Sequence, residues 1–104
     1  MKKLSQKLKE KRKKIDLIDR KLLTLLNDRL RVALKAGKIK KKMGEKIYRP
    51  EREKEVLKRI KIRNKGPLKE KDLEKIFGTI IRVCRRSQIK QGGRKRSRNS
   101  SPLR

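Results

Sequence analysis

The feature that most constrains the fold is a stretch of some forty residues, from Leu4 to Met43, that contains no proline and one glycine, Gly37. Apolar residues recur in it at intervals of three, four or seven, which is the spacing of one face of an α-helix. The members of this apolar stripe are Leu4, Leu8, Ile15, Ile18, Leu22, Leu25, Val32, Ala36, Ile39 and Met43. The pattern predicts one continuous helix over residues 4–43, with Gly44 as its stop.

Two shorter helices are predicted after it. The second spans about residues 50–63, because Pro50 suits a first helical position and the Gly66-Pro67 turn signal ends the segment. The third spans about residues 69–91. Its apolar face comprises Leu73, Ile76, Phe77, Ile80, Ile81 and Cys84. Since the sequence shows no strand pattern and no repeat, the predicted fold class is all-α, a three-helix chain with a very long first helix.

The length of the first helix predicts a second copy of the chain. At about 1.5 Å per residue it spans roughly 60 Å, whereas a compact domain of this size has a radius of gyration of about 13 Å. Only 32% of the residues are hydrophobic, so a single chain buries a thin core. The two short helices cover only part of the apolar stripe, and we expect an intertwined helical homodimer to cover the rest.

The chain is strongly basic, with 38 Lys and Arg against 11 Asp and Glu and a net charge of +27. Such a charge requires an anionic partner, counterions or an extended shape. Nucleic acid, an acidic membrane surface and a small polyanion are the candidate partners. The sequence has neither an apolar run of about eighteen residues that would span a bilayer nor an apolar segment behind its lysine-rich start, so we expect a cytoplasmic protein with no membrane partner.

The C-terminal segment differs from the helical part. Residues 92–104 are basic, contain serine and lack apolar periodicity, so we predict a disordered tail after a helical domain over residues 1–91. The tail holds five cations and no acid, and subtracting them from +27 leaves +22 on the helical domain. Nucleic-acid binding by the tail and a link to a further domain both remain open, and nothing in the sequence supports one over the other.

Several classes of active site are excluded by residue type. The chain has no histidine, and Cys84 is its single cysteine. This composition excludes an internal disulfide, a Cys-His nucleophile, a Ser-His-Asp triad and a zinc site of the common Cys/His type.

Four polar side chains lie in phase with apolar faces that should be buried. Arg29 and Lys40 lie on the apolar stripe, and no acid of the same helix lies beside them in phase. Glu53 is in phase with the apolar face of the second helix and Gln88 with that of the third. A buried charge is costly unless it is paired. Simpler interpretations are snorkelling for the two cations, a favourable helix N-terminus for Glu53 and a frayed helix end for Gln88.

Four segments, in this order, resemble the all-helical, AroQ-type chorismate mutases: "RKKIDLIDRKLLTLLNDRLRVALKAGKIK", "YRPEREKEVL", "GPL" and "IFGTIIRVCRRSQ". The resemblance covers about residues 4–91. It implies a dimer of three-helix chains with two active sites, each completed by the long first helix of the partner. It also implies an isomerase that rearranges the dianion chorismate to prephenate, in the shikimate pathway branch of aromatic amino acid biosynthesis.

The resemblance assigns three cations to the substrate's anionic groups. Arg12 from one subunit and Arg29 from the other match the residues that hold the two carboxylates. Helix phase alone would favour Lys11 over Arg12, so the two criteria disagree here. Lys40 matches the lysine that contacts a carboxylate and the ether oxygen of the breaking bond.

Further site residues follow from the same resemblance. Gln88 matches the group on the other side of the ether oxygen, Glu53 matches the acceptor for the ring hydroxyl, and Arg52 matches a supporting arginine. The sequence departs from the family in two places. Arg49 stands where many relatives carry an aspartate, so a contact with the hydroxyl from this position would come from its backbone. Cys84 stands where relatives often carry serine, which replaces a hydroxyl contact with a weaker thiol.

The predicted chemistry needs no metal and no cofactor, because a pericyclic rearrangement requires neither a nucleophile nor proton transfer. Two alternatives remain open. One is isochorismate pyruvate lyase activity on the same fold. The other is a basic helical nucleic-acid-binding module, although Tyr48 and Phe77 are the only aromatic residues and do not favour a base-stacking platform.

Overall fold

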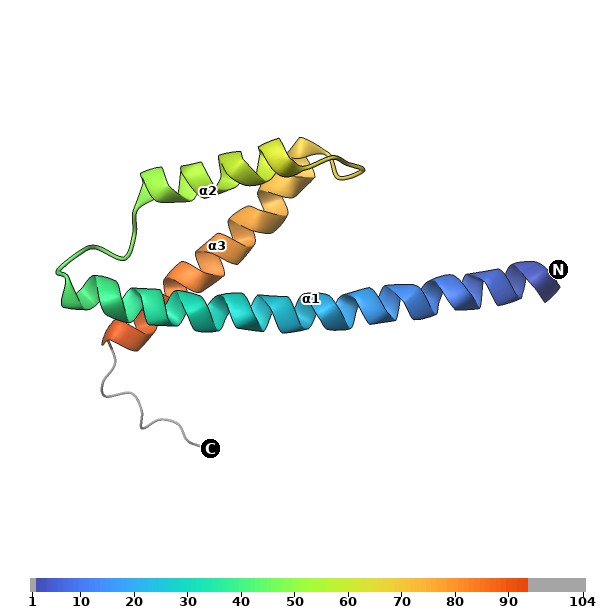
Figure 1. Cartoon of the computed structure of the whole chain (residues 1–104), viewed down its shortest axis with the longest axis horizontal. Coiled ribbons are helices and arrows are strands. Elements are labelled where there is room, and N and C mark those ends of the chain that lie inside the picture. Colours follow the sequence, from blue (N-terminus) through green and yellow to red (C-terminus); the bar gives the residue numbers. More distant parts are fainter. Residues whose placement is uncertain (1, 94–104) are drawn as a thin grey trace, which may run out of the picture. The chain divides into compact units, whose positions relative to one another are not determined.

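The computed structural model describes residues 2–93, and over these residues it contains three α-helices and no strand (Figure 1). They are α1 (Lys2–Lys42), α2 (Pro50–Arg63) and α3 (Glu70–Gly93). The all-α prediction with a very long first helix is confirmed. α3 continues through Gly92 and Gly93, two residues past its predicted end, and the rest of the predicted tail lies outside the described residues.

α1 ends where the glycine signal predicted. Gly44 has a φ of +74°, a left-handed conformation that glycine adopts without strain. The N–H groups of Gly44 and Glu45 donate to the carbonyls of Lys41 (3.1 Å) and Lys40 (2.8 Å). These bonds satisfy carbonyl groups that the end of a helix otherwise leaves without partners.

The chain divides into two units, residues 1–31 and residues 32–104. The described part of the first unit is helical throughout and belongs to α1. Its apolar side chains remain open to solvent in the single chain, for example Ile15 (54% exposed), Leu22 (51%) and Leu25 (62%). A single helix has no element of its own on which to bury such a stripe.

The second unit contains the last turns of α1, followed by α2 and α3. Its small core comes from α3, where Leu73, Ile81 and Cys84 are buried. α2 contributes side chains that are only half-buried. The turn between α2 and α3 is held by Asn64, whose Nδ2 donates to the Leu68 carbonyl (2.9 Å) and whose Oδ1 accepts from the N–H of Gly66 (3.0 Å).

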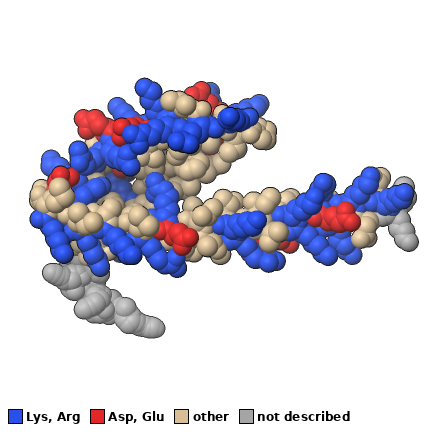
Figure 2. Space-filling model, viewed as in Figure 1, with Lys and Arg blue, Asp and Glu red and all other residues tan. Residues whose placement is uncertain are grey.

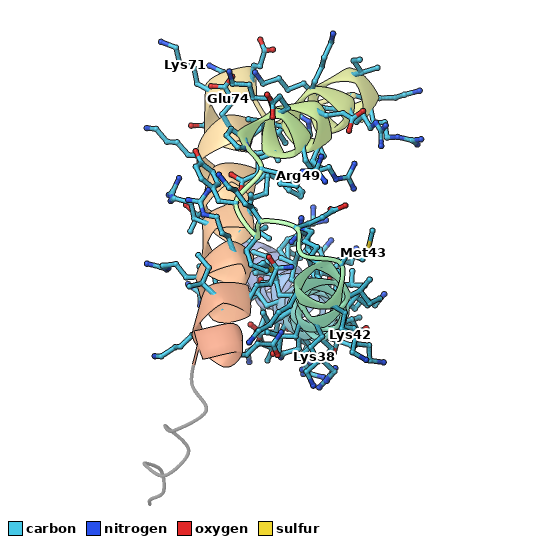
Figure 3. The ribbon with its side chains drawn as sticks, turned by 90° about the vertical axis from the view of Figure 1, so that its left-hand side faces the viewer. Lys38, Lys42, Met43, Arg49, Lys71 and Glu74 are labelled. Carbon is cyan, nitrogen blue, oxygen red and sulfur yellow. The ribbon has the colours of Figure 1, made fainter. Side chains whose placement is uncertain are left out.

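An ion pair joins α2 to α3 beside this turn. The Lys61 ammonium donates to the Glu74 carboxylate, and this hydrogen bond raises the pKa of Lys61 above its usual value. Figure 3 shows Glu74 on the side of α3 that faces α2, while Lys71 points away from it. The pair therefore ties the two helices at the end where the turn connects them.

Hydrogen bonds from α3 side chains join its C-terminal half to α1. The side-chain amides of Gln88 and Gln91 donate to the carbonyls of Ala33 (2.6 Å) and Leu34 (2.7 Å). One further bond runs from the Lys41 ammonium to the carbonyl of Gly92 (2.6 Å). Three polar side chains thus hold the last turns of α1 against α3, in a unit with few buried apolar groups.

Lys and Arg dominate the visible surface of both units (Figure 2). Three of the acids pair with arginines three or four residues away in sequence, as Asp28 does with Arg31 (2.9 Å). Exposed pairs of this kind contribute little to stability. None of the helices in residues 2–93 is both long enough and apolar enough to cross a membrane.

Candidate active site

Three of the predicted cations line one cavity of the second unit. Lys40 comes from the last turn of α1, Arg49 directly precedes α2, and Arg52 lies in the first turn of α2. They surround a space of about 430 Å³, together with Glu51 and Glu55. Figure 3 shows Arg49 at the start of α2, on the side towards α1. The connection between the two helices is short, so it brings these cations to one place.

The cations of this cavity are open to an anionic ligand. Within residues 2–93, no acid forms an ion pair with Lys40, which is half-buried. Arg49 pairs with Glu45 (3.0 Å), and Arg52 pairs with Glu55 (3.2 Å). Both pairs are exposed, and pairs of this type contribute about 0–1 kcal/mol. A carboxylate entering the cavity can therefore exchange with them at small cost.

Glu53 lies against an arginine that the sequence interpretation did not include. Arg85 Nη1 donates to both carboxylate oxygens of Glu53, at 2.7 and 2.9 Å, and its guanidinium stacks over the Tyr48 ring with 4.3 Å to the centroid. Both side chains of the pair are about three-quarters buried or more, with 21% exposed for Arg85 and 25% for Glu53. Because a carboxylate offers about four lone-pair sites, Glu53 retains acceptors for a hydroxyl group.

The position of Arg85 in the sequence could have identified it as a candidate site residue. Arg85 follows Ile81 by four residues and precedes Gln88 by three, so it lies near the buried face of α3. The same phase test identified Arg29 and Lys40 on α1. Applied equally to α3, the test would have included Arg85 among the candidate site residues.

Gln88 is held inside the second unit. It is 8% exposed, and its Nε2 donates to the Ala33 carbonyl at 2.6 Å. The alternative interpretation of Gln88 as part of a frayed helix end is wrong, because α3 continues for five further residues. Its amide carries two N–H donors, and the Ala33 carbonyl engages one of them. Cys84, one turn earlier on α3, is also buried.

Arg12 and Arg29 belong to the first unit, where Arg12 is exposed and Arg29 is half-buried. The choice between Arg12 and Lys11 remains open, since both side chains are exposed on this helix. The participation of Arg12 and Arg29 in one active site with residues of the second unit remains a prediction.

The structure brings Lys40, Arg49 and Arg52 together at one cavity. Glu53 and Gln88 line two other cavities of the second unit, so the single chain does not bring all five residues to one place. Their functional groups are cations, one amide and one carboxylate, which can bind an anionic molecule and stabilise negative charge that develops on it. The described residues contain no group of three or more His, Cys, Asp or Glu side chains suited to a metal ion.

Comparisons with known proteins agree with the sequence motifs. The family model described as chorismate mutase type II matches residues 11–89. The bifunctional chorismate mutase/prephenate dehydratase of Aquifex aeolicus is 41% identical over 83 residues, which cover 76% of this chain and 23% of the relative. The protein of the same name from Pseudomonas aeruginosa is 42% identical over 82 residues, which cover 74% of this chain and 22% of the relative. The chorismate mutase of Methanocaldococcus jannaschii is 46% identical over 56 residues, which cover 54% of this chain and 57% of the relative. The chain thus spans less than a quarter of the length of the two bifunctional relatives.

Proposed function

The chain belongs to the chorismate mutase type II family, and on this premise we propose that it catalyses the rearrangement of chorismate to prephenate. The observation that carries the proposal is the cavity lined by Lys40, Arg49 and Arg52. The substrate is a small dianion. The cavity wall carries three cations against two acids, Glu51 and Glu55, so its net positive charge suits the binding of such a molecule. The cytoplasmic location remains a prediction.

The proposed mechanism is stabilisation of one reactive conformer and of the charge that forms as its C–O bond breaks. Lys40 and Gln88 donate hydrogen bonds to the ether oxygen from two sides, while Glu53 accepts a hydrogen bond from the ring hydroxyl. Fixed donors of this kind lower the barrier because they need no reorganisation during the reaction. The Arg85 contact contributes by holding the Glu53 carboxylate in one orientation.

We also propose a homodimer whose two chains complete each active site. The support is the apolar stripe of α1, which one chain leaves exposed: Ile18 is 55% exposed, Val32 64% and Ile39 58%. A contiguous apolar face of this extent marks an interaction surface in a soluble protein. The proposed partner is a second copy, because its own α1 presents an identical stripe and a two-fold axis can pair the two faces.

The dimer gives a prediction in solution. At micromolar concentration, light scattering should give about twice the 12.4 kDa of one chain. Leu25→Lys, which places a charge on the apolar stripe, should weaken the dimer and reduce helix content together. Thr24→Lys is the matched control, since it adds the same charge about 100° away around the helix. A wild-type chain that is a compact, cooperatively unfolding monomer would contradict the architecture.

The function itself is tested by direct assay of the purified chain. With chorismate, we expect loss of substrate and stoichiometric formation of prephenate without added metal or cofactor. Isochorismate supplied in parallel should release no pyruvate. Turnover of isochorismate alone would assign the chain to the lyase activity, and turnover of neither substrate by the folded dimer would reject the proposal.

A further inference from the structure

Gly37 is buried on α1 against the side chains of Gln88 and Gln91 of α3. A Cβ atom added to Gly37 would lie 3.0 Å from Cγ and 3.2 Å from Cβ of Gln88, and 3.3 Å from Nε2 of Gln91. These distances are shorter than an ordinary van der Waals contact, so any side chain here would push Gln88 aside. Only glycine leaves room for the observed Gln88 conformation.

The missing side chain also exposes a hydrogen-bond acceptor. In an α-helix each Cβ is tilted towards the N-terminus and covers the preceding turn, so a side chain at Gly37 would lie over the carbonyl of Ala33, four residues earlier. A carbonyl oxygen has two lone pairs, of which the helical hydrogen bond uses one. The second accepts the Gln88 amide at 2.6 Å. Gly37 thus permits both the close approach and the bond.

We propose that Gly37 is a positioning residue that aims the Gln88 amide at the substrate. The inference rests on the proposed function, in which Gln88 donates to the ether oxygen. One N–H of the amide is fixed on the Ala33 carbonyl, which sets the plane of the amide and the direction of its second N–H. A donor acts on a transition state only when it is aligned in advance, and Gly37 supplies that alignment without touching the substrate.

The test replaces Gly37 by alanine in the whole chain of 104 residues. The new methyl group forces Gln88 to move by a few tenths of an ångström, and we expect kcat for chorismate to fall about tenfold while KM changes much less. The control is Gly92→Ala at the same contact of α1 and α3, where an added Cβ meets only the Lys41 side chain at 3.9 Å. Gly92→Ala should retain the wild-type kcat, and both variants should retain the wild-type helix content.

A double variant separates positioning from packing. In the Gln88→Ala background the amide is absent, so Gly37→Ala should cause no further loss of kcat. Full additivity of the two losses would overturn the inference, and so would a Gly37→Ala enzyme with wild-type kcat.

A second readout does not depend on turnover. In ¹⁵N–¹H spectra of the wild-type protein, one side-chain N–H of Gln88 should show the low-field shift of a hydrogen-bonded donor. Gly37→Ala should remove this shift and Gly92→Ala should preserve it. If the wild-type chain failed to convert chorismate, the proposed function would fail, yet the spectra would still decide the coupling of Gly37 to Gln88. An unchanged Gln88 signal in Gly37→Ala would overturn that coupling.

Discussion

Lys40→Ala should lower kcat for the chorismate rearrangement by roughly 10²-fold or more, which is the loss typical of a removed transition-state donor. Lys40 is half-buried beside a cavity, and within residues 2–93 no acid forms an ion pair with it. The proposed contact with the ether oxygen strengthens as negative charge develops there, so most of the loss falls on kcat. The carboxylate contact assigned to Lys40 adds a smaller rise in KM. Steady-state kinetics of the purified variant measure both parameters.

The matched control distinguishes a positioned donor from attraction by a surface of net charge +27. Lys38→Ala removes the same charge from an exposed position of the same helix, and Figure 3 shows Lys38 away from α2. General attraction of a dianion is screened by salt, so Lys38→Ala should cause only a small, salt-sensitive fall in kcat/KM. Equal losses in both variants that disappear at high salt would assign the activity to the basic surface instead of a defined site.

The helices could be predicted from the sequence because their signals are local. Apolar spacing indicated α1 and α3, and Pro50 and Gly44 marked boundaries that the structure confirms within one or two residues. The phase test likewise found Gln88, whose burial on an inner face the structure confirms. These features depend only on residues within a few turns of each other.

Contacts between different helices could not be predicted from these local patterns. The pairing of Arg85 with Glu53 joins residues 32 positions apart on different helices, and no local pattern specifies which acid an arginine will meet. The role of Gly37 likewise depends on the approach of α3 to α1. Helix periodicity cannot predict this approach, because it describes each helix separately. The choice between Lys11 and Arg12 depends on a partner chain, because both side chains are exposed on a single α1.

Mixing two inactive variants should restore activity if each site draws on both chains. Arg12→Ala and Arg29→Ala, each as a homodimer, should lose roughly 10²-fold or more in kcat/KM, since each leaves one substrate carboxylate without its partner. A heterodimer of the two combines both lesions in one site and leaves the other site intact. With random exchange, half of the dimers are mixed and each has one intact site, so the mixture should recover about a quarter of wild-type activity.

The controls make the recovery specific to a shared site. As a control, we propose that the same chain supplies Arg29 and Lys40 to each site. Arg29→Ala mixed with Lys40→Ala should then show no recovery, because each mixed site lacks one of the two groups. Subunit exchange is verified separately with differently tagged chains. Recovery with the first pair alone therefore requires Arg12 and Arg29 to meet across the dimer. If exchange were complete and the first pair stayed inactive, each site would belong to one chain. If Lys11 binds the carboxylate in place of Arg12, the single variants show it before any mixing. Arg12→Ala would then retain activity, and Lys11→Ala would lose it.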